Sequence, residues 1–233
     1  NPDDHQKYLL DWLPESRQWS YTLGTTFKHY GNNWYHFFVL SRSGLYNKVE
    51  KYTGNDRHNP KTIDYRSGES ENKFRFEHHR YAANGFKLQV GAGIEYAHYD
   101  NTTARRLFAA GEAIDQYYSR ALNMWKWAVF GQVSRSFFSE RLALSLGLRA
   151  DGCNYTGKTA ALYRQISPRF SFSYAFDERW SLNGNIGRYY QLPAYTTLGF
   201  ADAGGVLVNK RNKTGYIGAD HYVLGVEYRP GTT

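Results

Sequence analysis

Residues 142–149 read Leu-Ala-Leu-Ser-Leu-Gly-Leu-Arg, so that leucine alternates with a small or polar residue. Successive side chains of a β-strand point to opposite faces of the sheet, and Leu142, Leu144, Leu146 and Leu148 therefore share one face. The residues between them share the other face. This stretch predicts a strand with one apolar face and one polar face.

The same period-two pattern recurs along most of the chain. In residues 86–97 apolar side chains at the even positions alternate with Lys87, Gln89, Glu95 and small residues at the odd positions, and residues 19–28 and 180–187 behave alike. Residues 34–42 are ambiguous, because aromatic and aliphatic side chains occupy both faces there. The repeated pattern predicts an all-β fold.

The placement of the aromatic residues indicates which solvent meets the apolar faces. A soluble sandwich spreads large aromatics through its buried face, whereas a membrane barrel concentrates them near strand ends, at the level of the lipid headgroups. Here they gather near the ends of the alternating segments, as at Trp19, Tyr21, Tyr96, Tyr99, Trp125, Trp127, Phe137, Phe138, Trp180, Tyr189 and Tyr190. We therefore expect lipid outside the sheet and water inside it.

The composition agrees with a barrel that has a wet interior. Aromatic residues make up 18% of the chain and charged residues 21%, yet the mean hydropathy is −0.68. Only every second residue of a barrel strand meets lipid, so a low average is expected. No run of about 18 or more apolar residues occurs, which excludes transmembrane helices.

Counting the alternating segments gives about nine strands of the length that crosses a bilayer. We expect them at residues 19–30, 34–42, 73–81, 86–98, 125–137, 142–151, 169–176, 180–190 and 222–228. The connections alternate between short and long, as they do between the periplasmic and extracellular sides of outer-membrane barrels. Short turns are expected near residues 31–33, 82–85, 138–141 and 177–179, and long loops at residues 43–72, 99–124, 152–167 and 191–221.

An odd number of strands does not make a finished bacterial barrel, because these have even strand numbers. The chain begins Asn1-Pro2-Asp3-Asp4, without an initiator methionine or a signal peptide. We therefore expect residues 1–233 to be an internal part of a larger antiparallel barrel domain, with residues 1–18 as the end of an extracellular loop.

Several short motifs resemble the barrels of TonB-dependent receptors, particularly those of the Bacteroidetes type. They are Ile166-Ser167-Pro168-Arg169-Phe170 at a strand entry and Gly187-Arg188-Tyr189-Tyr190-Gln191-Leu192-Pro193 at a strand exit. The order and spacing of these and weaker matches extend the resemblance over roughly residues 125–229.

The resemblance implies a 22-stranded barrel that encloses an N-terminal plug, since barrels of that size are plugged. It implies TonB-energised import of a scarce ligand such as a ferric siderophore, cobalamin or a glycan. No plug and no TonB box is recognisable in these residues, so the chain is expected to form part of the barrel wall. The implied partners are outer-membrane lipid and lipopolysaccharide, the imported ligand, and TonB through the plug.

The net charge of +8 raises the question of nucleic-acid binding. The aromatic residues follow the lipid-facing period and do not interleave with basic residues, so no nucleic-acid partner is expected. Basic residues of the lumen and loops favour anionic ligands or lipopolysaccharide phosphates, or are simply solvated, at Lys87, Arg105, Arg106, Lys126, Arg149, Arg169 and Arg188.

No enzymatic or metal chemistry is indicated. His78 and His79 are adjacent and point to opposite faces of a strand, so they cannot chelate one ion together. Cys153 has no partner for a disulfide and no activating neighbour in the sequence. Glu95, Asp151 and Glu227 fall on the polar face without an accompanying nucleophile. We therefore expect no catalytic site, no metal site and no cofactor.

Ligand contacts are expected on the long outer loops, because binding groups concentrate on loops that a rigid scaffold positions. The candidates at the predicted mouth of the barrel are Arg188, Tyr189, Tyr190, Gln191 and Tyr195, for which packing within the aromatic girdle is the alternative role. The stretch 104–124 is a candidate for a short amphipathic segment over the entrance.

Two other functions stay open from the sequence. A passive porin or small closed barrel needs no plug and is complete with one more strand. A soluble all-β binding module requires a dry interior behind the leucines and a polar outer face on every strand. Solubility without detergent distinguishes this last possibility from the membrane barrels.

Overall fold

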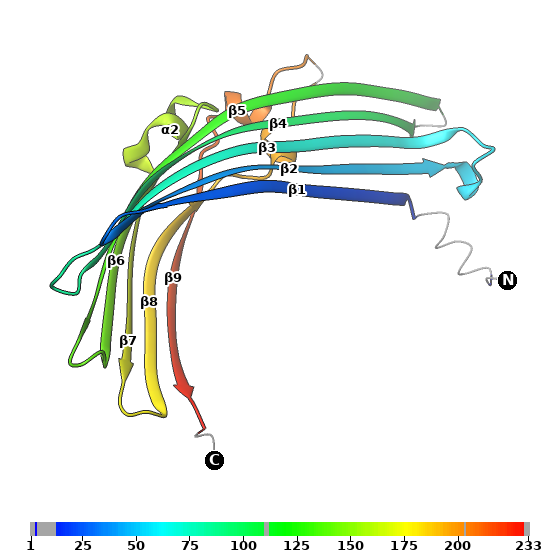
Figure 1. The fold of residues 1–233 in the computed structure, drawn as a ribbon. Coiled ribbons are helices and arrows are strands. Elements are labelled where there is room, and N and C mark those ends of the chain that lie inside the picture. The colour runs from blue at the N-terminus through cyan, green and yellow to red at the C-terminus, as the bar shows by residue number, and fades with distance from the viewer. Residues whose placement is uncertain (1–2, 4–12, 110–111, 203, 231–233) are drawn as a thin grey trace.

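The computed structural model describes residues 3, 13–109, 112–202 and 204–230, and these form one antiparallel sheet. Its nine strands pair in chain order, each with the next, and β1 and β9 are the two edges. The strands are β1 (Glu15–Tyr30), β2 (Trp34–Tyr52), β3 (Lys61–Tyr81), β4 (Lys87–Ala109), β5 (Glu112–Phe137), β6 (Leu142–Cys153), β7 (Ile166–Ala175), β8 (Trp180–Gln191) and β9 (Ile217–Tyr228). Figure 1 shows the sheet bending strongly, with β1–β5 running across the view and β7–β9 running down it. The prediction of an unclosed antiparallel sheet of nine strands is confirmed.

Helices are few and short, and they lie in the connections. They are η1 (Thr53–Asn55), α2 (Gly157–Ala160), η2 (Leu162–Arg164), α3 (Tyr195–Leu198) and α4 (Val208–Arg211). Among the described residues, none of these helices has the length and apolar character to cross a membrane.

The pairing register assigns the two faces of the sheet. Leu146 lies opposite Val133 and Phe170, and Leu148 lies opposite Pro168, so the apolar side chains of β5, β6 and β7 share one face. We call this the outer face, and the face that carries Glu95 and Lys126 the inner face. Leu146 is 59% exposed and Leu148 is 54% exposed, so the outer-face leucines pack against no second layer.

The ambiguous strand at residues 34–42 is resolved by its neighbours. Phe38 pairs with Phe27 of β1 and with Phe76 of β3, and the three rings form an apolar row on the outer face. Phe37 is therefore on the inner face, where the ammonium of Lys28 lies 5.2 Å from its ring centre. Alternation along this strand alone allowed either Phe37 or Phe38 to lie on the outer face. Pairing with β1 and β3 selects Phe38.

Two of the expected long loops are wrong. Residues 43–72 contain the continuation of β2 to Tyr52 and the start of β3 at Lys61, so the connection is residues 53–60. Residues 99–124 belong mostly to β4 and β5, which pair as far as Ala109 and Glu112, and no amphipathic segment covers the entrance there. Residues 110–111 lie outside the described residues. Backbone pairing does not require an apolar face, so the ladders continue after the period-two pattern ends.

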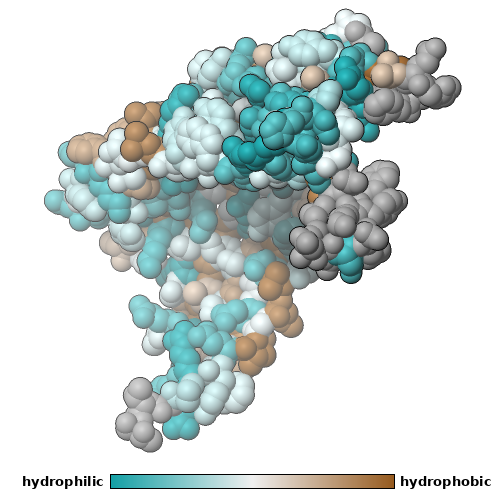
Figure 2. Space-filling view, turned by 90° about the vertical axis from the view of Figure 1, so that its right-hand side faces the viewer, coloured by the Kyte–Doolittle hydropathy of each residue, from teal (hydrophilic) through white to brown (hydrophobic). Residues whose placement is uncertain are grey.

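The other connections agree better with the sequence. The four short turns lie where they are expected, and the stretches after β6 and β8 are irregular, with α2 and η2 in the first and α3 and α4 in the second. Figure 2 shows mainly hydrophilic side chains over the upper part of the molecule, and lower down hydrophobic side chains that gather along one side among hydrophilic ones. Residues 1–2 and 4–12 of the expected N-terminal loop lie outside the described residues.

Candidate functional site

A cavity of about 550 Å³ lies between the inner face of β3–β6 and the connection from β8 to β9. Its walls combine charged side chains of the sheet with aromatic side chains of the connection, including Glu71, Lys73, Glu95, Lys126, Tyr195 and Tyr216. Strand pairing brings the charges together, because Glu95 on β4 lies directly between Lys73 on β3 and Lys126 on β5.

Lys126 is the centre of a network of polar contacts in this cavity. Its Nζ atom lies 3.0 Å from Oε1 of Glu71 and 2.6 Å from the hydroxyl oxygen of Tyr195. It also forms an ion pair with Glu95, and the Tyr195 hydroxyl donates a hydrogen bond to Glu71. Lys73 closes the network, with Nζ 2.5 Å from Oε2 of Glu71 and 3.5 Å from Oε2 of Glu95.

The two carboxylates and two ammonium groups of this network balance in formal charge. Three of the four side chains are mostly buried, since Glu95 is 18% exposed and Glu71 and Lys126 are each 21% exposed, whereas Lys73 is 45% exposed. An ion pair in such surroundings keeps its geometry only where hydrogen bonds satisfy its remaining atoms, and Tyr195 supplies such bonds here. Burial and the nearby Glu71 carboxylate raise the pKa of Tyr195 above its ordinary value, so the phenol stays protonated and donates.

The connection that carries Tyr195 is held against the sheet by a hydrophobic cluster. Leu198 of α3 is fully buried, and it packs with residues of β4, β5 and β6 and of the segment after β6, namely Tyr99, Leu122, Met124, Cys153 and Tyr155. The hydroxyl of Tyr155 donates a hydrogen bond of 2.7 Å to the carbonyl oxygen of Leu198. The cluster joins the β6–β7 and β8–β9 connections, so the roof of the cavity is packed against its wall.

Three of the five residues expected to contact a ligand line this cavity: Tyr190, Gln191 and Tyr195. The other two do not line it. Arg188 is on the outer-face register and forms a bidentate ion pair with Asp220, with both N–O distances at 2.7 Å. Tyr189 is on the inner face, where the guanidinium of Arg169 lies 4.5 Å from its ring centre.

Sequence reasoning missed Glu71 and Lys73 as members of this site. Glu71 falls in residues 43–72, which were expected to be a loop, and apolar and polar side chains do not alternate in the sequence around it. One signal in the sequence pointed to them. Glu95 and Lys126 lie on the polar faces of two consecutive strands, and this favours a charged partner on the strand that precedes them.

The other polar residues singled out from the sequence have local partners. Asp151 accepts hydrogen bonds from Arg149, two residues away on β6, and Glu227 pairs with Arg229. In the part of the chain that the structure describes, no group of three or more His, Cys, Asp or Glu side chains is arranged to hold a metal ion. Cys153 is buried in the hydrophobic cluster.

A family model described as the β-barrel of TonB-dependent receptor-like proteins matches residues 1–231. The chain belongs to the TonB-dependent receptor β-barrel family. No curated protein sequence matches it. The match covers nearly the whole chain, so the strands before residue 125, which resemble the family by pattern alone, belong to the same barrel domain as the later ones.

Solved structures of outer-membrane transporters and receptors share the fold. The outer membrane transporter YddB from Escherichia coli has a TM-score of 0.62 at 15% identity, over 94% of this chain and 33% of that chain. The siderophore receptor PiuA from Acinetobacter baumannii has a TM-score of 0.61 at 12% identity, over 94% and 38%.

The ferric yersiniabactin uptake receptor FyuA from Yersinia pestis has a TM-score of 0.58 at 8% identity, over 93% of this chain and 34% of that chain. The chain thus spans about a third of the length of these structures. At such identities the likeness shows the fold, and the fold is that of part of a TonB-dependent receptor barrel.

Proposed function

We propose that this chain forms part of the wall and outer loops of a bacterial outer-membrane receptor that imports a scarce ligand with energy from TonB. The observation that carries the proposal is the inner-face cavity, in which a buried charged network and several aromatic side chains meet under a packed loop. Ligand sites are concave, with a few well-placed polar groups among apolar ones. The exposed outer-face leucines support a position in lipid.

The ligand class is a ferric siderophore, cobalamin or a glycan. All three present hydrogen-bonding groups along their edges. Tyr190, Gln191 and Tyr195 line the cavity, where Tyr195 contributes its ring face and hydroxyl, and the three are the proposed contacts from this chain. The structural neighbours PiuA and FyuA, which are a siderophore receptor and a ferric yersiniabactin uptake receptor, favour the iron chelates.

The proposed partners follow from the same assignment. TonB acts through a plug domain that is not among residues 1–233, and the outer face contacts lipid and lipopolysaccharide. No nucleic-acid partner, cofactor or enzymatic activity is proposed.

The test is uptake by cells that carry the complete receptor as their sole route for the ligand. Growth is measured with a panel of ferric siderophores under iron limitation, with cobalamin as the sole source of that vitamin, and with oligosaccharides as sole carbon source. We expect growth on one class that disappears when TonB is deleted. Growth that persists without TonB, together with swelling of receptor-containing liposomes in small solutes, indicates a passive porin and overturns the proposal.

A further inference from the structure

The inner-face cavity is hollow because two neighbouring positions of the sheet carry almost no side chain. Gly93 on β4 pairs with Ala128 on β5, and both lie on the inner face. Among the described residues, a Cβ atom placed at Gly93 would meet only the carbonyl oxygen of Phe74, at 3.5 Å. At Gly91, the next inner-face position, it would clash with the ring of Phe130. A ligand group therefore has room at Gly93, and charged side chains surround that space.

Two cations line the cavity beside the lysines of the network, and each has a carboxylate partner on its own strand. Arg149 donates hydrogen bonds of 2.7, 2.9 and 3.0 Å to Asp151. The Nε atom of Arg75 lies 2.9 Å from Oε1 of Glu77, whose side chain is only 7% exposed. The sequence makes Lys126 and Arg149 candidates for attracting anionic ligands, and the structure gives both of them a carboxylate partner instead.

One carboxylate of the cavity wall has no such partner. Glu69 lies on the inner face of β3, two residues before Glu71, and lines the cavity. Within the described part of the chain, no basic side chain forms an ion pair with Glu69 and no group donates a hydrogen bond to its carboxylate. A carboxylate only accepts hydrogen bonds, so a ligand group that meets Glu69 must donate one.

Glu69 and Glu71 also line a second hollow of about 310 Å³, so the two hollows share part of their walls. Strand pairing sets Thr22 of β1 and Ser43 of β2 on the rung of Glu71, and Ser20 on the rung of Glu69. No lysine, arginine or histidine among the described residues lines this second hollow. Its polar side chains are hydroxyl groups and carboxylates, which suit a ligand that carries hydroxyl groups of its own.

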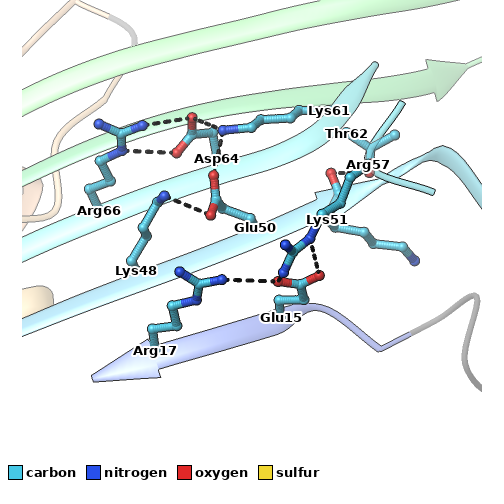
Figure 3. Close-up of polar contacts among 10 residues, drawn as sticks. All are labelled: Glu15, Arg17, Lys48, Glu50, Lys51, Arg57, Lys61, Thr62, Asp64 and Arg66. Carbon is cyan, nitrogen blue, oxygen red and sulfur yellow. Dashed lines mark hydrogen bonds and ion pairs between the residues drawn. The ribbon is translucent and has the colours of Figure 1, made fainter. Parts of the chain in front are cut away.

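The outer face of the same strands has the opposite balance of charge. There Lys48 and Lys61 both contact Glu50. Arg66 and Lys61 both contact Asp64, so three cations surround two carboxylates (Figure 3). Such a surplus is what an anionic ligand requires. On the described cavity wall four cations face five carboxylates, once the partner of Arg75 is counted.

We propose that the ligand presents an uncharged, hydroxyl-bearing edge to this wall, and that the receptor selects against anionic ligands. The inference rests on the proposed function, because it takes the inner-face cavity as the ligand site. An anion that enters must draw a cation away from a largely buried carboxylate, and it meets Glu69 as a like charge. A hydroxyl group instead donates to Glu69 and exchanges hydrogen bonds with the serine and threonine hydroxyls of the second hollow.

The test compares matched neutral and anionic probes for binding to the complete receptor in detergent, by isothermal titration calorimetry. The pairs are a neutral ferric trihydroxamate with an anionic ferric tricatecholate, cobalamin with a derivative whose side-chain amides are hydrolysed to carboxylates, and a neutral oligosaccharide with its carboxylated form. In the class that binds, we expect the neutral probe to bind at least about tenfold more tightly, because juxtaposed like charges oppose association.

The variant E69Q removes the charge of Glu69 and keeps its shape. It is expected to bind the neutral probe more weakly and the anionic probe more tightly, so that the preference narrows at least about threefold. The matched control E178Q removes a carboxylate from the exposed turn between β7 and β8 and is expected to keep the native preference. The comparison of probes on the native receptor needs no variant, so it decides the inference even where E69Q does not fold.

Equal or tighter binding of the anionic probe by the native receptor overturns the inference, and so does a folded E69Q variant that keeps the native preference. Uptake by cells separates these results from a failure of the proposed function. An anionic probe that is bound tightly and imported only when TonB is present refutes the neutral-ligand inference and leaves the proposed function intact. Uptake that continues without TonB refutes the proposed function, and the preference of the purified receptor still decides the inference.

Discussion

The hydroxyl oxygen of Tyr195 lies 2.6 Å from the Nζ atom of Lys126, although the two residues are 69 positions apart in the chain. Tyr195 belongs to the loop that follows β8, and Lys126 belongs to the middle of the sheet. Their contact fastens the roof of the candidate cavity to its wall. It also makes the charged network sensitive to any movement of the roof.

The first prediction concerns this contact. Replacing Tyr195 with phenylalanine keeps the ring and removes the hydroxyl bonds to Lys126 and Glu71. Hydrogen bonds to charged groups are worth about 1.5–3 kcal/mol, so local opening of residues 192–216 is expected to increase at least about tenfold. Hydrogen–deuterium exchange of that segment in the complete receptor measures the change.

Tyr163 provides a matched control for the loss of a hydroxyl, because it lies in the other helical connection and is 71% exposed. Y163F is expected to leave exchange of residues 192–216 unchanged. Equal exchange in Y195F and the native receptor shows that the hydroxyl does not fasten the loop.

The second prediction tests which face meets lipid. Arginine in place of Leu146 puts a charge on the outer face, and such a substitution near the centre of a bilayer costs about 2–4 kcal/mol of folding free energy. Arginine in place of Ser145 puts the same side chain on the inner face, where water is available. Urea unfolding in lipid vesicles is expected to show the larger loss for L146R. Equal losses contradict the assignment of faces.

The third prediction concerns the hydrophobic cluster that holds the β8–β9 connection. Replacing the fully buried Leu198 with alanine leaves a cavity and costs about 2–5 kcal/mol. Because β8 and β9 stay paired, the loss is expected as local opening, seen as faster proteolytic cleavage between residues 199 and 215. V206A, at a position 48% exposed on the same connection, serves as the control and is expected to cleave at the native rate.

The fourth prediction is a pH dependence at the ends of β2 and β3. Hydrogen bonds from Lys48 and Lys61 hold the pKa of Glu50 below its ordinary value of 4.5. A group with a depressed pKa in the folded state adds stability above its unfolded pKa, and this stability is lost as the pH falls through the folded pKa. Exchange of residues 48–64 is therefore expected to accelerate below about pH 4.

In E50Q the same segment is expected to lose most of this pH dependence, while its exchange at neutral pH is already faster than in the native receptor. A native profile that stays flat from neutral pH down through this range, after correction for the intrinsic exchange rate, refutes the role of Glu50.

Much of the fold follows from local pattern. The alternation in residues 142–149 places Leu146 and Ser145 on opposite faces of one strand in any sheet that contains it, and the short turns are equally local. The candidate site does not follow in this way. Glu71 reaches Lys126 and Tyr195 only because β3, β4 and β5 pair in one register and a distant loop folds back over them. Three of the five expected contact residues line the cavity. A position near a strand end fixes the level at which a residue lies along the barrel axis, but it does not fix which way the side chain points.

The sequence by itself determined that the chain forms strands with one lipid-like and one polar face, since side-chain direction along a strand alternates with a fixed period of two. It also indicated the order of strands and turns. Tertiary structure alone decided how far the strands extend, which face Phe37 and Phe38 occupy, and where the charges converge. Backbone hydrogen bonding between neighbours sets strand length and register, and it joins residues that no local pattern relates.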